Sequence, residues 1–189
     1  MSKLSIIPIA LCLAASPVLC AAEHRELGAH EHGHGTLNIA VEGNSVRMEL
    51  EAPGDDIVGF EHDPSTPAET KTIAAAKATL AKPLELFQPP AAAKCMVKDT
   101  KVTIREEEHE GDHAEGQKDK EKAEAHHNEF YVEYALECAA IEEMKSLRFG
   151  YFAAFPKAQS LTVNVIMPKG QSRFEASRTS SKIDLGGSM

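Results

Sequence analysis

The sequence predicts an α+β domain, built mostly on an antiparallel β-sheet with one main helix. The first observation is that apolar and polar residues alternate over several short segments, as in strands that bury one face. The second is that one alanine-rich segment that begins at a proline has helical spacing. A polar insert, residues 106–127, follows neither pattern and separates two of the predicted strands.

The first predicted element is a β-hairpin with one buried face. Its alternating apolar residues are Leu37, Ile39 and Val41, then Val46, Met48 and Leu50. Gly43-Asn44 supplies the turn. Pro53 to Asp56 ends the hairpin, and we expect an irregular loop from Ile57 to Pro64.

The main helix is predicted over Ala68 to Ala81. Thr66 is suited to the N-cap, Pro67 to the first turn, and Pro83 stops the helix. Its apolar stripe consists of Ile73, Ala76 and Leu80.

The rest of the chain is predicted to be mainly strands. Residues 95–97 and 102–104 read as two short strands around a turn at Asp99-Thr100, and Phe130 to Cys138 gives the clearest alternation. Residues 141–145 suggest a helical turn, and residues 147–155 fit either a strand or a short helix. Further strands are expected at 161–165, around Phe174, and at 183–185, where the last would close the sheet.

The N-terminus has the pattern of a cleaved secretory signal peptide. Lys3 precedes an apolar run, and small residues follow at Cys20-Ala21-Ala22. We therefore expect cleavage near residue 22, a single exported domain over residues 23–189, and no membrane anchor. Removing residues 1–22 removes one lysine and no acid, so the net charge of −9 becomes about −10. An acidic surface argues against nucleic acid as a partner and favours cations.

Two cysteines, Cys95 and Cys138, remain in the predicted mature chain. In an oxidising compartment they most simply form one disulfide that encloses the insert. Thiolate ligation of a metal is the alternative, although no Cys-x-x-Cys spacing supports it.

Nine histidines dominate the functional signal, and most fall in two polar clusters. His30, His32 and His34 repeat at period two, so in an extended segment they would share one face and could share a zinc ion. The glycines between them leave the backbone free to bend, which could break that parity. Glu61 and His62 lie side by side in the irregular loop, where His62 could be a ligand or a turn-stabilising partner of Asp63.

The insert holds the second cluster: His109, His113, His126 and His127 among nine acidic residues. It has no aliphatic residue larger than alanine, so we expect it to be disordered without ligand and to bind metal at weak, multiple sites.

Catalytic motifs are missing from the sequence. It has no His-Glu-x-x-His helix and no Gly-x-Ser-x-Gly elbow, so no enzyme activity is predicted. Two alternatives stay open: a zinc-dependent hydrolase that uses the three-histidine cluster, and a Cu(II)- or Ni(II)-binding chaperone. The second would gain from His24 if cleavage fell after Ala21.

These motifs together resemble the ZrgA-type family of zinc-regulated periplasmic proteins. The resemblance rests on the His30–Gly35 segment before a strand, the Gly59-Phe60-Glu61-His62 motif, and the histidine- and acid-rich insert between Cys95 and Cys138. It implies a periplasmic protein that binds Zn²⁺ and contributes to its acquisition, buffering or delivery, with a component of an ABC-type importer as partner. It carries over to His30, His32, His34, Glu61 and His62, and to the insert histidines as a class.

Overall fold

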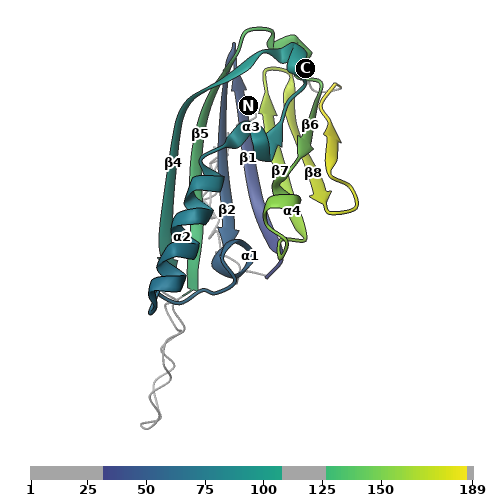
Figure 1. The fold of residues 1–189 in the computed structure, drawn as a ribbon. Helices are drawn as coiled ribbons and strands as arrows, with labels where there is room; N and C mark the ends of the chain where they lie inside the picture. The colour runs from purple at the N-terminus through teal and green to yellow at the C-terminus, as the bar shows by residue number, and fades with distance from the viewer. Residues whose placement is uncertain (1–31, 108–126, 187–189) are drawn as a thin grey trace, which may run out of the picture.

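The computed structural model describes residues 32–107 and 127–186 (Figure 1). The predicted signal peptide, His24, His30 and the insert histidines His109, His113 and His126 lie outside the described residues.

A six-stranded sheet forms the body of the molecule, with strand order β4-β5-β2-β1-β7-β8. Its strands are β1 (His34–Glu42), β2 (Ser45–Pro53), β4 (Cys95–Glu107), β5 (His127–Cys138), β7 (Ser160–Met167) and β8 (Gly170–Ser177). All neighbouring strands are antiparallel except β1 and β7, which run parallel. The predicted α+β fold with a mostly antiparallel sheet is therefore confirmed.

One face of this sheet carries the core. The alternating residues of the predicted hairpin point inward, and Leu37, Val46 and Leu50 are fully buried. Phe130 and Val132 of β5 continue the same layer, as the pattern of that segment predicted. The opposite face is polar, and Asn164 donates a hydrogen bond to Asn38 across β7 and β1 at 2.9 Å.

Helices and a second, three-stranded sheet cover the inner face of the main sheet (Figure 1). The small sheet has the order β3-β6-β9, with β3 (Phe87–Gln88), β6 (Ser146–Phe149) and β9 (Lys182–Asp184). The helices are α1 (Gly54–Ile57), α2 (Pro67–Leu80), α3 (Pro83–Leu86) and α4 (Tyr151–Ala154), with 3₁₀ turns η1 (Ala91–Ala93) and η2 (Ile141–Glu143). Residues 183–185 were thus predicted in the wrong sheet, because β9 pairs with β6 and not with an edge of the main sheet.

Helix α2 is the predicted main helix. The Thr66 side chain accepts the backbone N–H of Glu69, and the Glu69 carboxylate accepts the backbone N–H of Thr66, which completes a capping box. Ala76 and Leu80 are buried, as the apolar stripe predicted. No helix in the described parts of the chain is long and apolar enough to cross a membrane.

Strand β4 corrects one prediction. Residues 95–107 form a single strand, and the predicted turn at Asp99-Thr100 is instead a β-bulge between Val97 and Asp99. The Asp99 side chain accepts the Thr100 backbone N–H at 2.9 Å. One inserted residue breaks the alternation without reversing the chain, so the sequence pattern looked like a turn.

The ends of the insert are also ordered further than predicted. Glu106 and Glu107 belong to β4, and His127 begins β5, because the ladder continues through the pairs Glu106–Asn128 and Glu107–His127. Cys95 and Cys138 form the predicted disulfide. They pair at the opposite end of the same ladder, so the strands themselves hold the ends of the insert together.

Candidate metal site

The turn before β1 separates two histidines that the sequence placed on one face. Gly33 has a backbone φ of +86°, in the left-handed region that favours glycine. This turn breaks the extended conformation, so His32 and His34 have different partners. The shared face that an extended segment would have given His32 and His34 is therefore lost at the Gly33 bend, which the sequence had left open.

His34 faces β7 on the polar side of the main sheet. Its Nδ1 is 2.8 Å from Ser160 Oγ, and its Nε2 is 3.1 Å from Thr162 Oγ1. Both ring nitrogens are thus engaged with hydroxyl groups of the neighbouring strand. A metal ion at His34 would have to displace one of these hydrogen bonds.

His32 instead meets Glu61 and His127. His32 Nε2 lies 3.2 Å from each carboxylate oxygen of Glu61, and His127 Nδ1 donates to Glu61 Oε2 at 2.5 Å. The Glu61 side chain is 11% exposed, against 60% for His32 and 37% for His127. A largely covered carboxylate therefore sits between two accessible imidazoles.

Backbone contacts hold the loop of Glu61 against the start of β5. The Asn128 N–H donates to the Glu61 carbonyl at 2.9 Å, directly beside His127. Gly54, at the start of α1, packs closely against the backbone of Phe60 and Asn128, the neighbours of Glu61 and His127. A Cβ at Gly54 would come within 2.7 Å of both Asn128 O and Phe60 O. The close approach at Gly54 lets the loop and the strand place Glu61 next to His127.

His62 points elsewhere. Its Nδ1 donates to the carbonyl oxygen of Asp63 at 2.8 Å, and its ring stacks on Phe60 with centroids 5.0 Å apart. The partner in this turn is thus the backbone of Asp63 and not its carboxylate. The described contacts of His62 do not join it to His32, Glu61 and His127.

The spacing of these three side chains is close to what zinc requires. Ligand atoms about 2.0–2.1 Å from a tetrahedral zinc ion lie about 3.3 Å from one another. The His32–Glu61 distance of 3.2 Å already has this value. The His127–Glu61 distance of 2.5 Å is that of a hydrogen bond, and zinc would have to widen it by about 0.8 Å.

The three groups are arranged as a hydrogen-bonded set and not as a formed metal site. Within residues 32–107 and 127–186, no three or more His, Cys, Asp or Glu side chains already stand in positions that would hold a metal ion. The imidazoles donate N–H groups to Glu61, and an imidazole must lose that proton before the same nitrogen can ligate. Zinc would therefore replace protons and shift side chains as it bound.

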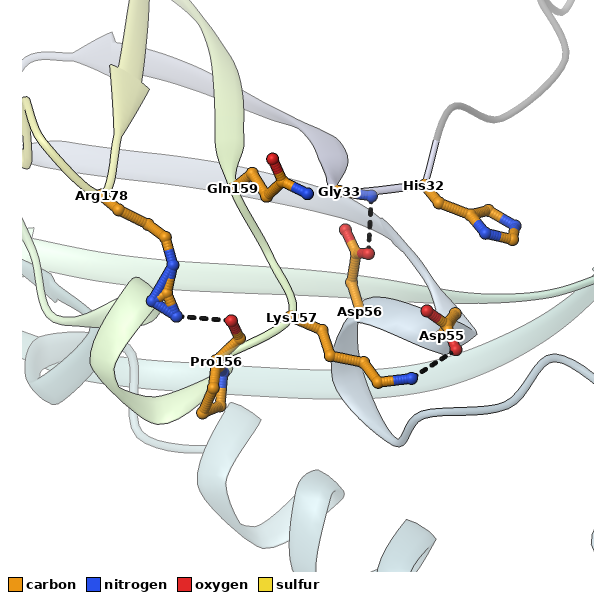
Figure 2. Close-up of a pocket in the computed structure, with 8 residues that line it drawn as sticks. All are labelled: His32, Gly33, Asp55, Asp56, Pro156, Lys157, Gln159 and Arg178. Atoms are coloured by element: carbon orange, nitrogen blue, oxygen red, sulfur yellow. Dashed lines mark hydrogen bonds and ion pairs between the residues drawn. The ribbon is translucent and has the colours of Figure 1, made fainter.

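A surface cleft of about 480 Å³ lies beside His32 (Figure 2). Its walls include Asp55 and Asp56 of α1, and Lys157 donates to Asp55 Oδ1 at 2.8 Å. Asp56 is 3% exposed and accepts the Gly33 N–H at 2.7 Å. Burial raises the pKa of the Asp56 carboxyl above its ordinary value, while the hydrogen bond from Gly33 opposes that shift.

Of the predicted site residues, the structure brings together His32, Glu61 and His127 and sets His34 and His62 apart. Asp56 was missed, because its sequence context Pro53-Gly54-Asp55-Asp56 reads as an exposed turn. Ser160 and Thr162 were missed for a different reason. Only the parallel pairing of β1 with β7 brings these hydroxyls to His34, and local sequence does not reveal that pairing.

Comparison with known protein families finds a match over most of the chain. The sequence model of a family described as "ZrgA family zinc uptake protein" matches residues 29–185. No curated protein matches the chain significantly.

Proposed function

Since the chain belongs to the ZrgA family of zinc uptake proteins, we propose that it is a periplasmic protein that captures zinc and hands it on during uptake. The observation that carries this proposal is the convergence of His32 and His127 on Glu61. Two imidazoles and one carboxylate are a ligand set that zinc accepts. They meet where the two histidine-rich segments of the sequence join the folded domain.

In this proposal His32 Nε2, Glu61 and His127 Nδ1 are three protein ligands of one zinc ion. A water molecule or His30 supplies the fourth, since His30 adjoins the site in sequence. His34 and His62 hold the local structure, because their partners are hydroxyl groups of β7 and a backbone carbonyl and not a second carboxylate or imidazole.

The insert acts as a collector of ions. His109, His113 and His126 lie among carboxylates, which together offer several weak ligand sets. A net charge of −9 also raises the local concentration of cations. Ions gathered there would pass to the better-defined site at His32, Glu61 and His127.

Release is as necessary to this function as capture. The 60% exposure of His32 leaves one ligand open to exchange with an acceptor protein. Protonation of the imidazoles competes with the metal, so binding weakens as the pH falls. The acceptor we propose is a periplasmic component of an ABC-type zinc importer.

Export through a cleaved signal peptide, residues 1–22, and a single zinc-binding domain over residues 23–189 complete the proposal. The disulfide between Cys95 and Cys138 supports an oxidising compartment. The description of the family as zinc uptake proteins favours binding and transfer over catalysis.

Zinc titration calorimetry on residues 23–189, compared with H32A, E61A and H127A, tests the proposal. We expect a site tighter than about 10 µM, which corresponds to about −7 kcal/mol, and at least tenfold weaker binding in each variant. The H62A variant is the matched control and should bind like the parent chain. No binding tighter than about 10 µM in the parent would refute the function, and unchanged binding in the three variants would refute the site.

The two alternative functions are examined with the same protein. Competition between Zn(II), Cu(II) and Ni(II) would reveal a copper or nickel protein if either ion displaced zinc at the concentrations expected in the cell. Turnover of ester or phosphate substrates by the zinc-loaded protein, lost in H32A, would instead indicate a hydrolase.

A further inference from the structure

We propose that Asp56 is a positioning residue of the zinc site, which acts through the Gly33 backbone to direct His32 toward Glu61. This inference rests on the proposed function. It adds a residue that contributes no ligand atom but determines where one ligand points.

The first observation is the hydrogen bond on the amide side of Gly33. Asp56 Oδ1 accepts the Gly33 N–H at 2.7 Å, and Asp56 is 3% exposed. The peptide that carries this N–H joins His32 to Gly33. Figure 2 shows the Asp56 carboxylate beneath the Gly33 amide and the His32 ring directed away from it.

The second observation is on the carbonyl side of the same residue. Gly33 O accepts the backbone N–H groups of Gln159 and Ser160, each at 2.9 Å. Gly33 is therefore fixed at both of its backbone polar groups. With φ at +86°, it turns the chain so that His32 leaves the direction of β1.

The anchor for Asp56 is α1. Close packing at Gly54 fixes the start of this short helix against Asn128 and Phe60. Lys157 Nζ donates to Asp55 Oδ1 in the helix at 2.8 Å and to the Gly59 carbonyl, just after the helix, at 3.4 Å. The loop that carries Glu61 follows this helix directly, so the contacts of α1 fix the positions of Asp56 and Glu61 relative to each other.

The second carboxylate oxygen of Asp56 adds no hydrogen bond to the described part of the fold. Asp56 Oδ2 is buried and has no hydrogen-bond partner among the described residues. Burying an unpaired polar atom is destabilising, and a smaller residue would avoid it. A role at the neighbouring site accounts for a carboxylate that makes one backbone hydrogen bond here.

Asp56 could alternatively ligate zinc directly through Oδ2, and Asp56→Asn separates the two roles. An asparagine keeps an oxygen that accepts the Gly33 N–H but is a poor zinc ligand. We expect D56N to bind zinc within about threefold of the parent and D56A to bind about tenfold more weakly. Equal losses in both variants would overturn the positioning role.

A double variant tests whether Asp56 acts through His32. If it does, H32A/D56A binds zinc no more weakly than H32A alone, because the positioned side chain is already missing. Losses that add in the double variant would contradict the proposal. D99A is the matched control: it removes an aspartate that likewise accepts a backbone N–H, that of Thr100 at 2.9 Å in the β4 bulge, without touching Gly33 or α1, and it should leave zinc affinity unchanged.

Hydrogen exchange of the Gly33 amide in the metal-free protein gives a readout that does not depend on zinc. We expect faster exchange in D56A than in D56N, and equal rates would refute the role of the Asp56 side chain in holding the Gly33 amide. If the parent chain did not bind zinc, the proposed function would fail. The exchange rates would still test whether the Asp56 side chain holds the Gly33 amide.

If D56A does not fold, the Gly33→Ala variant provides a second test of the positioning role. It disfavours the left-handed turn and brings a Cβ within 3.1 Å of the flexible Gln159 side chain, while Asp56 itself is unchanged. Weaker zinc binding by G33A supports the positioning role, and parent-like binding opposes it.

Discussion

At the scale of single residues, Glu61 joins two parts of the chain that lie 29 positions before it and 66 positions after it. Its carboxylate is the common acceptor for His32 and His127. Covering most of the Glu61 side chain strengthens its electrostatic interaction with whatever cation lies beside it. Glu61, which accepts hydrogen bonds from two imidazoles in the metal-free protein, is therefore also well placed to bind one divalent ion.

The two neighbouring histidines of the N-terminal motif should respond differently to mutation. H34A is expected to leave zinc affinity within about threefold, whereas H32A weakens it at least tenfold, or about 1.4 kcal/mol. The reason is that Ser160 and Thr162 already engage both ring nitrogens of His34. Calorimetry on the two variants checks this, and a larger loss in H34A would return His34 to the ligand set.

Asp56 should make the stability of the metal-free fold depend on pH. Burial raises its pKa in the folded state above the ordinary 3.8. Its contribution is therefore most favourable below that ordinary value and is lost as the pH rises through the folded-state pKa. Asparagine does not ionise, so D56N does not lose stability in this way as the pH rises. The free energy of unfolding of D56N minus that of the parent, measured in urea titrations, should therefore increase from about pH 3.5 to pH 7. A difference that stays constant over this range would contradict the burial argument.

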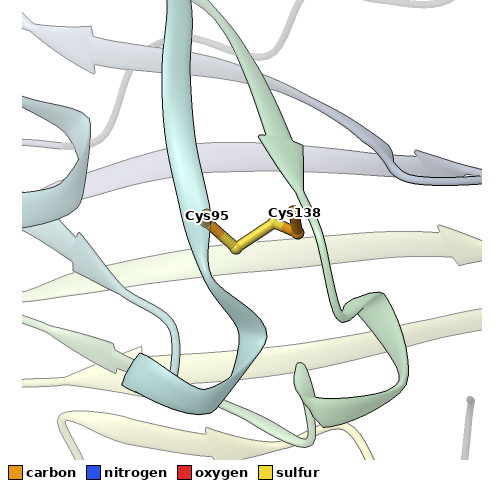
Figure 3. The surroundings of a disulfide bond; sticks show 2 residues. All are labelled: Cys95 and Cys138. Carbon is orange, nitrogen blue, oxygen red and sulfur yellow. A yellow bond between two sulfur atoms is a disulfide. The ribbon is translucent and has the colours of Figure 1, made fainter.

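At the scale of elements, the β4–β5 ladder separates the disulfide from the candidate site. Cys95 pairs with Cys138 at one end, and Glu107 pairs with His127 at the other (Figure 3 shows the disulfide). The strands span about 40 Å between these ends, at about 3.3 Å per residue. The two ends should therefore respond independently to mutation.

Replacing both cysteines by alanine should lower stability without changing zinc affinity. The cross-link constrains a long segment of the unfolded chain, and its loss is expected to lower the free energy of unfolding by roughly 3–4 kcal/mol. Thermal denaturation gives the stability, and calorimetry below the melting temperature gives the affinity. A large loss of zinc affinity in the folded double variant would show that the two ends are coupled.

Sequence patterns predicted the elements whose signal is local. The hairpin of Leu37 and Val46, the helix capped by Thr66, and the strand of Phe130 and Val132 follow from periodicity and capping residues. The bulge after Val97 was misread, because one added residue breaks a period of two. The parallel pairing of β1 with β7 joins segments more than a hundred residues apart, and no periodicity encodes such a contact.

At the scale of the whole molecule, the fold brings the ends of both histidine-rich segments to one carboxylate. The sequence predicted each cluster from composition, and it identified His32, Glu61 and His127 as separate candidates. It could not predict their meeting, because that depends on the Gly33 turn and on the backbone bond between Asn128 and Glu61. Site residues were therefore predictable by type, and their grouping was not.

The insert should be dispensable for folding and for the tightest zinc site. Because Glu107 pairs with His127, replacing residues 108–126 by Asn-Gly closes a two-residue hairpin. We expect the shortened chain to fold and to keep its tightest site, while the total zinc bound per chain falls. Metal analysis and calorimetry measure both quantities. Loss of the tightest site would show that insert residues are primary ligands, and an unchanged total would remove the collecting role.

The most direct measurement is an anomalous-difference map, collected at the zinc absorption edge, from crystals of residues 23–189 loaded with one equivalent of zinc. We expect the strongest peak between His32 Nε2, Glu61 and His127 Nδ1, with bond lengths of about 2.0–2.2 Å. A strongest peak at His34 or His62, or one with no contact to Glu61, would contradict it.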